Sequence, residues 1–323
     1  MNELVILTGP TAVGKTELSI ALAKRIHGEI ISADSIQVYK RMNIGSAKIT
    51  KEEMQGVKHY LIDVLDPKDA FNVHIFQKMA KEAVSEIQNK GKIPIIVGGT
   101  GFYIQALLYD IHFDETDNEH EYRKQLEQIA SDKGNEYLYQ MLKEIDPLSA
   151  EEIHFNNTKR VIRALEYYHD TGKTISSHNY EQRGNQSPYN FAYFVLNDKR
   201  ELLYQRIEER VDIMLKNGLI EEVKELLAHG CDADMVSMQG IGYKEVVNHL
   251  ENNISLEDTA ELIKKNTRHF AKRQLTWFRR EKDVCMINID DFEYNQEKIL
   301  AEMLMNLKKR NIIKDEICLL YTS

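Results

Sequence analysis

Residues 9–16 read GPTAVGKT, the full G-x-x-x-x-G-K-[ST] spacing of a phosphate-binding loop. The glycines allow the backbone to curl so that successive N–H groups point at phosphate oxygens. Lys15 adds a positive charge, and the hydroxyl of Thr16 suits a magnesium ion. The motif therefore predicts a site for a phosphorylated ligand, with Thr16 as the metal ligand. The residues of this site are Gly9, Pro10, Thr11, Ala12, Val13, Gly14, Lys15 and Thr16.

The surroundings of the motif support this prediction. An apolar run, Leu4–Leu7, precedes it, and Leu18, Ala21, Leu22 and Ile26 form a helical stripe after it. A helix that starts at the loop offers its positive N-terminal end to the same anion. A Gly-rich turn without a ligand is the alternative, and the strand–loop–helix context argues against it.

Two further segments follow apolar runs in the same way. Asp34 comes directly after EIISA, and Gly98–Gly101 ends the run IPIIVGG with Thr100 inside it. Ligands of open parallel sheets bind beyond the carboxyl ends of the strands, so Asp34 and Thr100 are expected to face the phosphate site. Asp34 could accept a proton or hold a metal-bound water. The alternatives are an Asp that caps the next helix and glycines that serve only a tight turn.

The elements that must position these residues alternate in type. The first four apolar runs are separated by segments with helical periodicity, which predicts an α/β fold: a P-loop-type core with a parallel sheet flanked by helices. The expected strands are 4–8, 29–33, 59–64, 93–99, 191–196 and 284–289.

The stretch from His112 to about residue 190 has no strand-like run. Its amphipathic segments predict helices at 119–133, 136–145 and 158–171, and hence a helical insertion domain at 112–190. The core is then expected in two parts, 1–111 and 191–310.

After the insertion, helices are expected at 201–217 with Gly218 as a C-cap, at 219–229, at 241–250 and from Ser255 onward. At the last of these, Ser255 and Asp258 are spaced as a capping box. The tail, 311–323, is left out of functional reasoning because CLLYTS resembles a translated sequencing adapter.

Composition limits the class of protein. With 42% hydrophobic and 29% charged residues, the chain is typical of a globular protein with a sizeable core. A strand-like run begins within three residues of Met1, which leaves no room for a signal peptide, and no apolar stretch predicts a membrane span. The three cysteines lack metal-ligand spacing. We therefore expect a cytoplasmic protein without a membrane partner.

The charge is unevenly distributed. The chain carries a formal charge of −9, yet residues 264–280, KKNTRHFAKRQLTWFRR, contain seven cations and no acid. Aromatic residues are interleaved with the cations, as expected for a surface that binds a polyanion. A surface helix whose aromatics face inward is the alternative interpretation.

The strands lack an acid where a nucleotide hydrolase needs one. IPIIV ends in glycines and threonine, and Asp63 lies inside the run 59–64 rather than at its end. A diphosphate could therefore be held as a leaving group rather than cleaved at phosphorus.

Seven segments together resemble the tRNA dimethylallyltransferase family of the bacterial type, also called tRNA isopentenyltransferases. They occur in family order from about residue 3 to residue 290. The segments are GPTAVGKT, ADSIQVYKRMNIGSAK, IVGGTGFYIQAL, KRVIRALE, RIEERVDIMLKNGLIEEV, QGIGYKE and TRHFAKRQLTWFRR.

This resemblance implies an activity. A dimethylallyl group would pass from dimethylallyl diphosphate to N6 of adenine 37, in tRNAs that read codons beginning with uridine. It implies Mg²⁺ as cofactor, Lys15, Asp34 and Thr100 as catalytic residues, and a monomer. It also implies that Arg206 or Arg210 reaches the diphosphate, without settling which.

The resemblance further implies contacts to the anticodon stem-loop. The residues at these positions are Asp34, Ser35, Ile36, Gln37, Thr100, Arg123, Lys159, Arg160, Val161, Ile162, Arg163, Gln239, Gly240, Ile241, Gly242, Tyr243, Lys244, Lys272 and Arg273.

Two other functions remain open at this point. A small-molecule or nucleotide kinase would use the same loop for ATP and Asp34 to activate a hydroxyl, but it leaves the basic segment 264–280 without a purpose. An RNA-binding protein without catalysis would leave Asp34 and Thr100 without one.

Overall fold

The computed structural model describes residues 2–113, 121–182 and 184–314 of the 323. The chain divides into two compact units, one formed by Met1–Leu108 with Pro188–Ser323 and the other by Tyr109–Ser187. No helix in the described ranges is long and apolar enough to cross a membrane.

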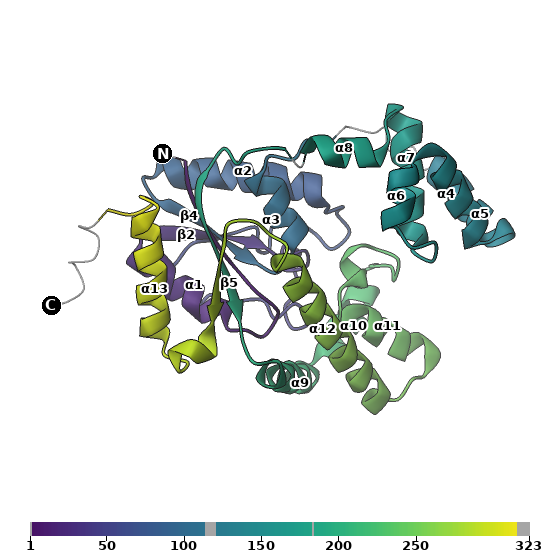
Figure 1. Ribbon diagram of the computed structural model, residues 1–323. Coiled ribbons are helices and arrows are strands. Elements are labelled where there is room, and N and C mark those ends of the chain that lie inside the picture. The colour runs from purple at the N-terminus through teal and green to yellow at the C-terminus, as the bar shows by residue number, and fades with distance from the viewer. Residues whose placement is uncertain (1, 114–120, 183, 315–323) are drawn as a thin grey trace. The chain divides into compact units, whose positions relative to one another are not determined.

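The first unit is built on a parallel sheet, six-stranded in the described ranges, in the order β3-β2-β4-β1-β5-β6 (Figure 1). The predicted α/β fold is confirmed. The strands are β1 (Glu3–Thr8), β2 (Gly28–Ala33), β3 (His59–Tyr60), β4 (Ile93–Gly98), β5 (Asn190–Asn197) and β6 (Val284–Asn288).

Helices cover both faces of this sheet. Figure 1 shows α1 (Lys15–Arg25) and α13 (Gln296–Lys309) on one side of the strands, and α2 (Val73–Asn89) and α3 (Gly101–Leu108) on the other. Side chains alternate along a strand, so Val5 and Leu7 pack into the core that includes α1 and α13.

Two features of the predicted sheet are wrong. Strand β3 ends at Tyr60, because Leu61 and Asp63 have φ of 61° and 54° and turn the backbone out of the sheet. Residues 34–58, all of which the structure describes, contain no helix, so the strand–helix alternation is interrupted after β2. This segment is held by long-range polar contacts instead.

Four helices lie between β5 and β6: α9 (Arg200–Lys216), α10 (Leu219–Ala228), α11 (Tyr243–Asn252) and α12 (Leu256–Phe278). A short 3-10 helix, Ser237–Gln239, precedes α11 and another, Ile289–Phe292, follows β6.

The ends of these helices differ from the prediction in three places. The C-cap of α9 is Asn217, and Gly218, with φ of 98°, belongs to the turn before α10. Helix α11 begins after Gly242 because φ there is 96°. At α12 the box is half formed: Ser255 Oγ accepts from the Asp258 N–H at 3.0 Å, but the short Asp258 carboxylate bonds the Ser255 hydroxyl.

The second unit contains helices joined by short loops and no strand in its described residues. Leu126, Leu138, Leu142 and Leu165 are fully buried in its own core. The prediction of a helix from 119 falls partly outside the described residues. The helices are α4 (Glu121–Lys133), α5 (Asn135–Ile145), α6 (Pro147–Glu152), α7 (Thr158–Thr171) and α8 (Ile175–Gln182).

The first residues after α13 are buried. Ile312 and Ile313 are both 5% exposed and pack into the core of the first unit with Met303 and Leu307. Setting the tail apart from residue 311 is therefore wrong for these two residues. Residues 315–323 lie outside the described ranges.

Candidate functional site

Three neighbouring strands end at the same edge of the sheet. Gly98 of β4 is in register with Thr8 of β1 and with Ala33 of β2, so the segments that follow these residues start side by side. Thr8 Oγ1 donates to the Gly98 carbonyl at 2.6 Å. A Cβ on Gly98 would lie 2.3 Å from the Ala33 carbonyl oxygen, so only glycine permits this close approach. The phosphate loop, Asp34 and the Gly99–Thr100 turn thus share one edge.

The phosphate loop has the backbone that its glycines allow. Gly9 and Gly14 have φ of 145° and 92°. Lys15 Nζ donates to the carbonyls of Gly9 and Pro10 at 2.9 and 2.7 Å, which holds the ammonium inside the loop. Removal from water and the charge of the nearby Arg210 together lower the pKa of Lys15 to about 7, although the charge of Asp34 acts in the opposite direction. An anion in the loop would stabilise the charged ammonium.

The two arginines that the sequence left unresolved have different partners. Arg206 Nη1 pairs with the buried Asp198 at 2.6 Å. Arg210 Nη1 lies 3.4 Å from Thr11 Oγ1 in the phosphate loop, and burial lowers its pKa. The guanidinium beside the loop is therefore that of Arg210.

Asp34 has one oxygen bound and one open. Its Oδ1 accepts from the N–H groups of Ile36 and Gln37 at 2.8 and 3.2 Å, which fixes the turn after β2. Its Oδ2 makes no hydrogen bond with any residue that the structure describes. Asp34 therefore caps a turn and not a helix, because residues 34–58 contain no helix, and its Oδ2 is left for the catalytic role that the resemblance implies.

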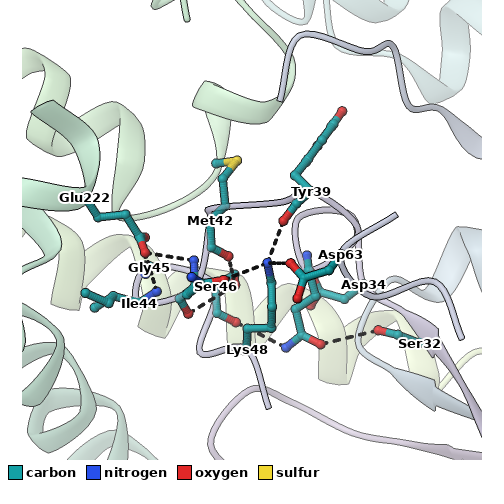
Figure 2. A network of polar contacts seen from close by, with 12 residues as sticks. Ser32, Asp34, Tyr39, Met42, Ile44, Gly45, Ser46, Lys48, Asp63 and Glu222 are labelled. Atoms are coloured by element: carbon teal, nitrogen blue, oxygen red, sulfur yellow. Dashed lines mark hydrogen bonds and ion pairs between the residues drawn. The ribbon is translucent and has the colours of Figure 1, made fainter. Parts of the chain in front are cut away.

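Lys48, which belongs to the loop after Asp34, stabilises that loop by hydrogen bonds to its own backbone and side chains (Figure 2). The side chain of Lys48 is 4% exposed. Its ammonium donates to the Tyr39 carbonyl, to Asn43 Oδ1 and to Asp63 Oδ1 at 2.5, 3.0 and 2.5 Å. A buried ammonium is stable only when its donors are all used, and here three acceptors use them.

Glu222 of α10 holds the same loop from the other side (Figure 2). Its carboxylate accepts from the N–H groups of Asn43, Ile44 and Gly45 at 2.8, 2.8 and 3.1 Å. It also accepts from the Tyr243 hydroxyl at 2.7 Å. Two segments far apart in sequence, 43–45 and the start of α11, are joined by this one carboxylate.

Gln274 of α12 connects the other two parts of the edge. Its Oε1 accepts from the Thr11 N–H, and its Nε2 donates to the Gly99 carbonyl, both at 2.9 Å. On the next turn of the helix, Trp277 lies over Gly101, where a Cβ would come within 2.3 Å of the ring. Sequence reasoning missed Gln274, Glu222 and Lys48. All three lie within quoted motifs, but nothing in their spacing indicates a polar contact.

A family model described as IPP transferase matches residues 37–281, more than half of the chain. The chain belongs to the IPP transferase family. It is 59% identical to a tRNA dimethylallyltransferase of Lachnoclostridium phytofermentans, over 97% of this chain and all of the relative. It is 50% identical to one of Acetivibrio thermocellus, over 94% and 96%. The resemblance read from the motifs is confirmed.

Solved structures agree with this assignment. A tRNA isopentenylpyrophosphate transferase of Bacillus halodurans superposes with a TM-score of 0.72 at 42% identity, covering 96% of this chain and 98% of that one. A eukaryotic dimethylallyltransferase, described as acting on tRNA, gives 0.80 at 31% identity, covering 96% and 80%.

In this IPP transferase family member, the basic segment lies on α12, and some of its charges are paired. Lys264 pairs with Asp212 and Arg268 with Glu208, both on α9. Lys272 and Arg273 are exposed and have no ion pair among the described residues. Phe278 is buried, so the helix combines an inward aromatic with an outward cationic face.

Four residues predicted to contact RNA are buried, and one of them is Gly242. Val161 and Ile162 belong to the core of the helical unit, and Tyr243 is fully buried against Glu222. Their side chains are unavailable to a partner, because apolar and hydrogen-bonded groups at these positions hold the fold. Arg123 makes a two-point pair with Glu166, at 2.8 and 2.6 Å. The exposed members of the set are Lys159, Arg160, Arg163, Gln239, Lys244, Lys272 and Arg273.

The described residues contain no cluster of three or more His, Cys, Asp or Glu side chains that could hold a metal ion by themselves. The hydroxyl of Thr16 is exposed and makes no hydrogen bond within the described ranges. Mg²⁺ is usually held by one or two protein oxygens, with phosphate oxygens and water completing the octahedron. Thr16 therefore fits a magnesium ion that arrives with a diphosphate.

Proposed function

We propose that this chain transfers a dimethylallyl group from dimethylallyl diphosphate to N6 of adenine 37, in tRNAs that read codons beginning with uridine. One observation carries the proposal. Strands β2, β4 and β1 are neighbours whose carboxyl ends lie side by side. The phosphate loop follows β1, and Asp34, whose Oδ2 makes no hydrogen bond among the described residues, follows β2. The names of the relatives support the same reaction.

The donor side is formed by the phosphate loop. Its backbone N–H groups, Lys15 and Arg210 bind the diphosphate, and Gly14 begins the α1 N-terminus that faces the same anion. Negative charge grows on the bridging oxygen as the C1–O bond breaks, and these groups stabilise it. The diphosphate then leaves with both phosphorus atoms intact.

The acceptor side is formed by Asp34 and Thr100. The exocyclic amine of adenine is a weak nucleophile because its lone pair is delocalised into the ring. Asp34 Oδ2 orients this amine and accepts its proton as the N6–C1 bond forms. The base leaves its stack to reach the site, as in other enzymes that act on bases.

Mg²⁺ is the proposed cofactor. When bound, the ion neutralises charge on the diphosphate and so makes it a better leaving group. In this chain, the Thr16 hydroxyl is the protein oxygen that would hold it. Lys15 and Arg210 supply the remaining positive charge.

The proposed RNA surface is the exposed face of α12 together with the loop after Asp34. Lys272 and Arg273 lie on the helix that also carries Gln274, whose amide reaches the donor loop. Ser35, Ile36 and Gln37 follow the catalytic carboxylate directly. We propose that these three residues contact the anticodon stem-loop of a tRNA. We further propose that the protein acts as a monomer in the cytoplasm, where tRNA is found.

The reaction is tested by incubating the protein with labelled dimethylallyl diphosphate or with γ-labelled ATP, each with and without tRNA. Label on tRNA from the allylic donor only, at N6 of adenine 37, supports the proposal. Transfer of phosphate from ATP to a small acceptor would contradict it and favour a kinase. Binding of tRNA without transfer from either donor would favour a non-catalytic RNA-binding protein.

A further inference from the structure

Gln274 is a buried side chain between two catalytic loops. It is 6% exposed, and its single amide accepts from the Thr11 N–H and donates to the Gly99 carbonyl, both at 2.9 Å. Thr11 lies in the phosphate loop, and Gly99 precedes Thr100. A side-chain amide carries its acceptor and its donor on two different atoms, so it can satisfy one backbone N–H and one backbone C=O at the same time.

Both loops are shaped to receive this amide. The Thr11 N–H points to Gln274 and is therefore used by the protein rather than by a phosphate. A Cβ on Gly99 would lie 2.0 Å from Gln274 Nε2, so glycine is required there for the contact to form. Arg210 holds the Thr11 hydroxyl from α9. Thr11 is thus fixed by side chains from two helices.

We propose that Gln274 is a positioning residue that sets the spacing between the phosphate loop and the Gly99–Thr100 turn. This inference rests on the proposed function, in which the first loop holds the diphosphate and the second faces the acceptor base. The allylic carbon belongs to a donor held by one loop, and the amine to a base that faces the other. A change of about 1 Å in their separation can cost about a hundredfold in rate.

The test compares Gln274→Met with Gln77→Met. Both glutamines are 6% exposed in helices of the same unit, and both donate to a backbone carbonyl, but the carbonyl bound by Gln77 of α2, at 2.7 Å, is that of Ala106, which lies outside both loops. Gln274→Met is expected to lower kcat between about tenfold and a hundredfold at saturating substrates. Gln77→Met is expected to lose similar stability to urea and to keep the native kcat.

A second variant guards against a folding defect. Gln274→Glu keeps an acceptor for the Thr11 N–H but loses the donor for the Gly99 carbonyl. A carboxylate oxygen would then face the Gly99 carbonyl oxygen, so its kcat is also expected to fall although the Thr11 contact is kept. Native kcat in Gln274→Met, with a stability loss equal to that of Gln77→Met, would overturn the inference.

The affinity for inorganic diphosphate, measured by calorimetry, separates this inference from the proposed function. If the native chain transfers no allyl group to tRNA, the proposed function fails. The positioning role is then decided by diphosphate binding alone. An affinity about tenfold weaker in Gln274→Met than in Gln77→Met supports it, and equal affinities overturn it.

Discussion

Strand β2 carries a carboxylate near each of its ends, and the two are used in opposite ways. At the amino end, Glu29 is 4% exposed and accepts from Lys92, Tyr60 and Lys90 at 2.7, 2.8 and 3.4 Å. At the carboxyl end, Asp34 binds two backbone N–H groups through Oδ1 only. Both oxygens of Glu29 are occupied, while one oxygen of Asp34 is open.

This difference distinguishes a carboxylate that stabilises the fold from one that can bind a substrate. Burial alone would raise the pKa of Glu29, but the hydrogen bonds from Lys92 and Tyr60 and the charges of Lys92 and Lys90 outweigh it and lower the pKa. A carboxylate satisfied in this way stabilises the fold and has no capacity for a substrate. The carboxyl end of the same strand keeps that capacity, in agreement with where open α/β sheets bind ligands.

The largest expected effect is on Asp34. Asp34→Asn keeps the Oδ1 acceptor for the turn but removes the proton acceptor, so single-turnover transfer should slow by about a hundredfold or more. The affinity for tRNA should stay within about twofold of the native value.

Glu29→Gln is the matched control on the same strand and should transfer at the native rate. Equal slowing in both variants would break the comparison between the two ends of β2. Loss of tRNA affinity in Asp34→Asn with normal single-turnover chemistry would also contradict the role of Asp34.

A second comparison of the same kind lies on α9. Arg206 forms an ion pair with Asp198, whereas Arg210 lies beside the phosphate loop. Arg210→Gln is expected to raise the KM for dimethylallyl diphosphate about tenfold, because a charge-assisted contact to the diphosphate is lost. Arg206→Gln should leave that KM unchanged and lower stability. A reversed pattern in steady-state kinetics would assign the donor contact to Arg206.

The next effect concerns the acceptor side. Glu222→Gln replaces one carboxylate oxygen by an NH₂ group that faces backbone donors, so the loop at 43–45 should loosen. We expect the KM for tRNA to rise about fivefold and the affinity for inorganic diphosphate to be unchanged.

Tyr243→Phe removes only the fourth hydrogen bond to Glu222 and should give a smaller rise in the KM for tRNA. If diphosphate binding weakens in step with tRNA binding, Glu222 supports the whole fold rather than the acceptor side.

The smallest effect is the acid response of Glu29. The folded state lowers its pKa below the ordinary 4.5, so its stabilisation is present above pH 4.5 and is lost as the pH falls through the folded-state pKa. Native protein should be about 1–2 kcal/mol more stable than Glu29→Gln near neutral pH. Urea unfolding below pH 4.5 should show this difference shrinking. If the difference in unfolding free energy between the two proteins does not change with pH, the ionised Glu29 does not stabilise the fold.

The sequence predicts well what a contiguous motif determines. The phosphate loop, the start of α1 and the placement of Asp34 after β2 follow from local backbone rules and from hydrophobic periodicity. The helix at 158–171 is another example. Its apolar stripe determines which face is buried, and Gly172, with φ of 70°, ends the helix.

The sequence does not predict contacts made by side chains far away in the chain. The loop at 34–58 has no periodicity, and its shape depends on Lys48, which lies within it, and on Glu222, which reaches it from α10. The choice between Arg206 and Arg210 depends on Asp198, which spacing alone cannot indicate. Gln274 reads as part of a basic helix until its two loop partners are known.

The central claim is that the phosphate loop holds a diphosphate as an intact leaving group. It is tested most directly with dimethylallyl diphosphate that carries ¹⁸O at the bridge between C1 and phosphorus, reacted with tRNA in ordinary water. Cleavage of the C1–O bond predicts that all of the ¹⁸O appears in the released diphosphate while the allyl group appears on N6 of adenine. ¹⁸O in dimethylallyl alcohol, or release of orthophosphate, would mean attack at phosphorus and would contradict the account.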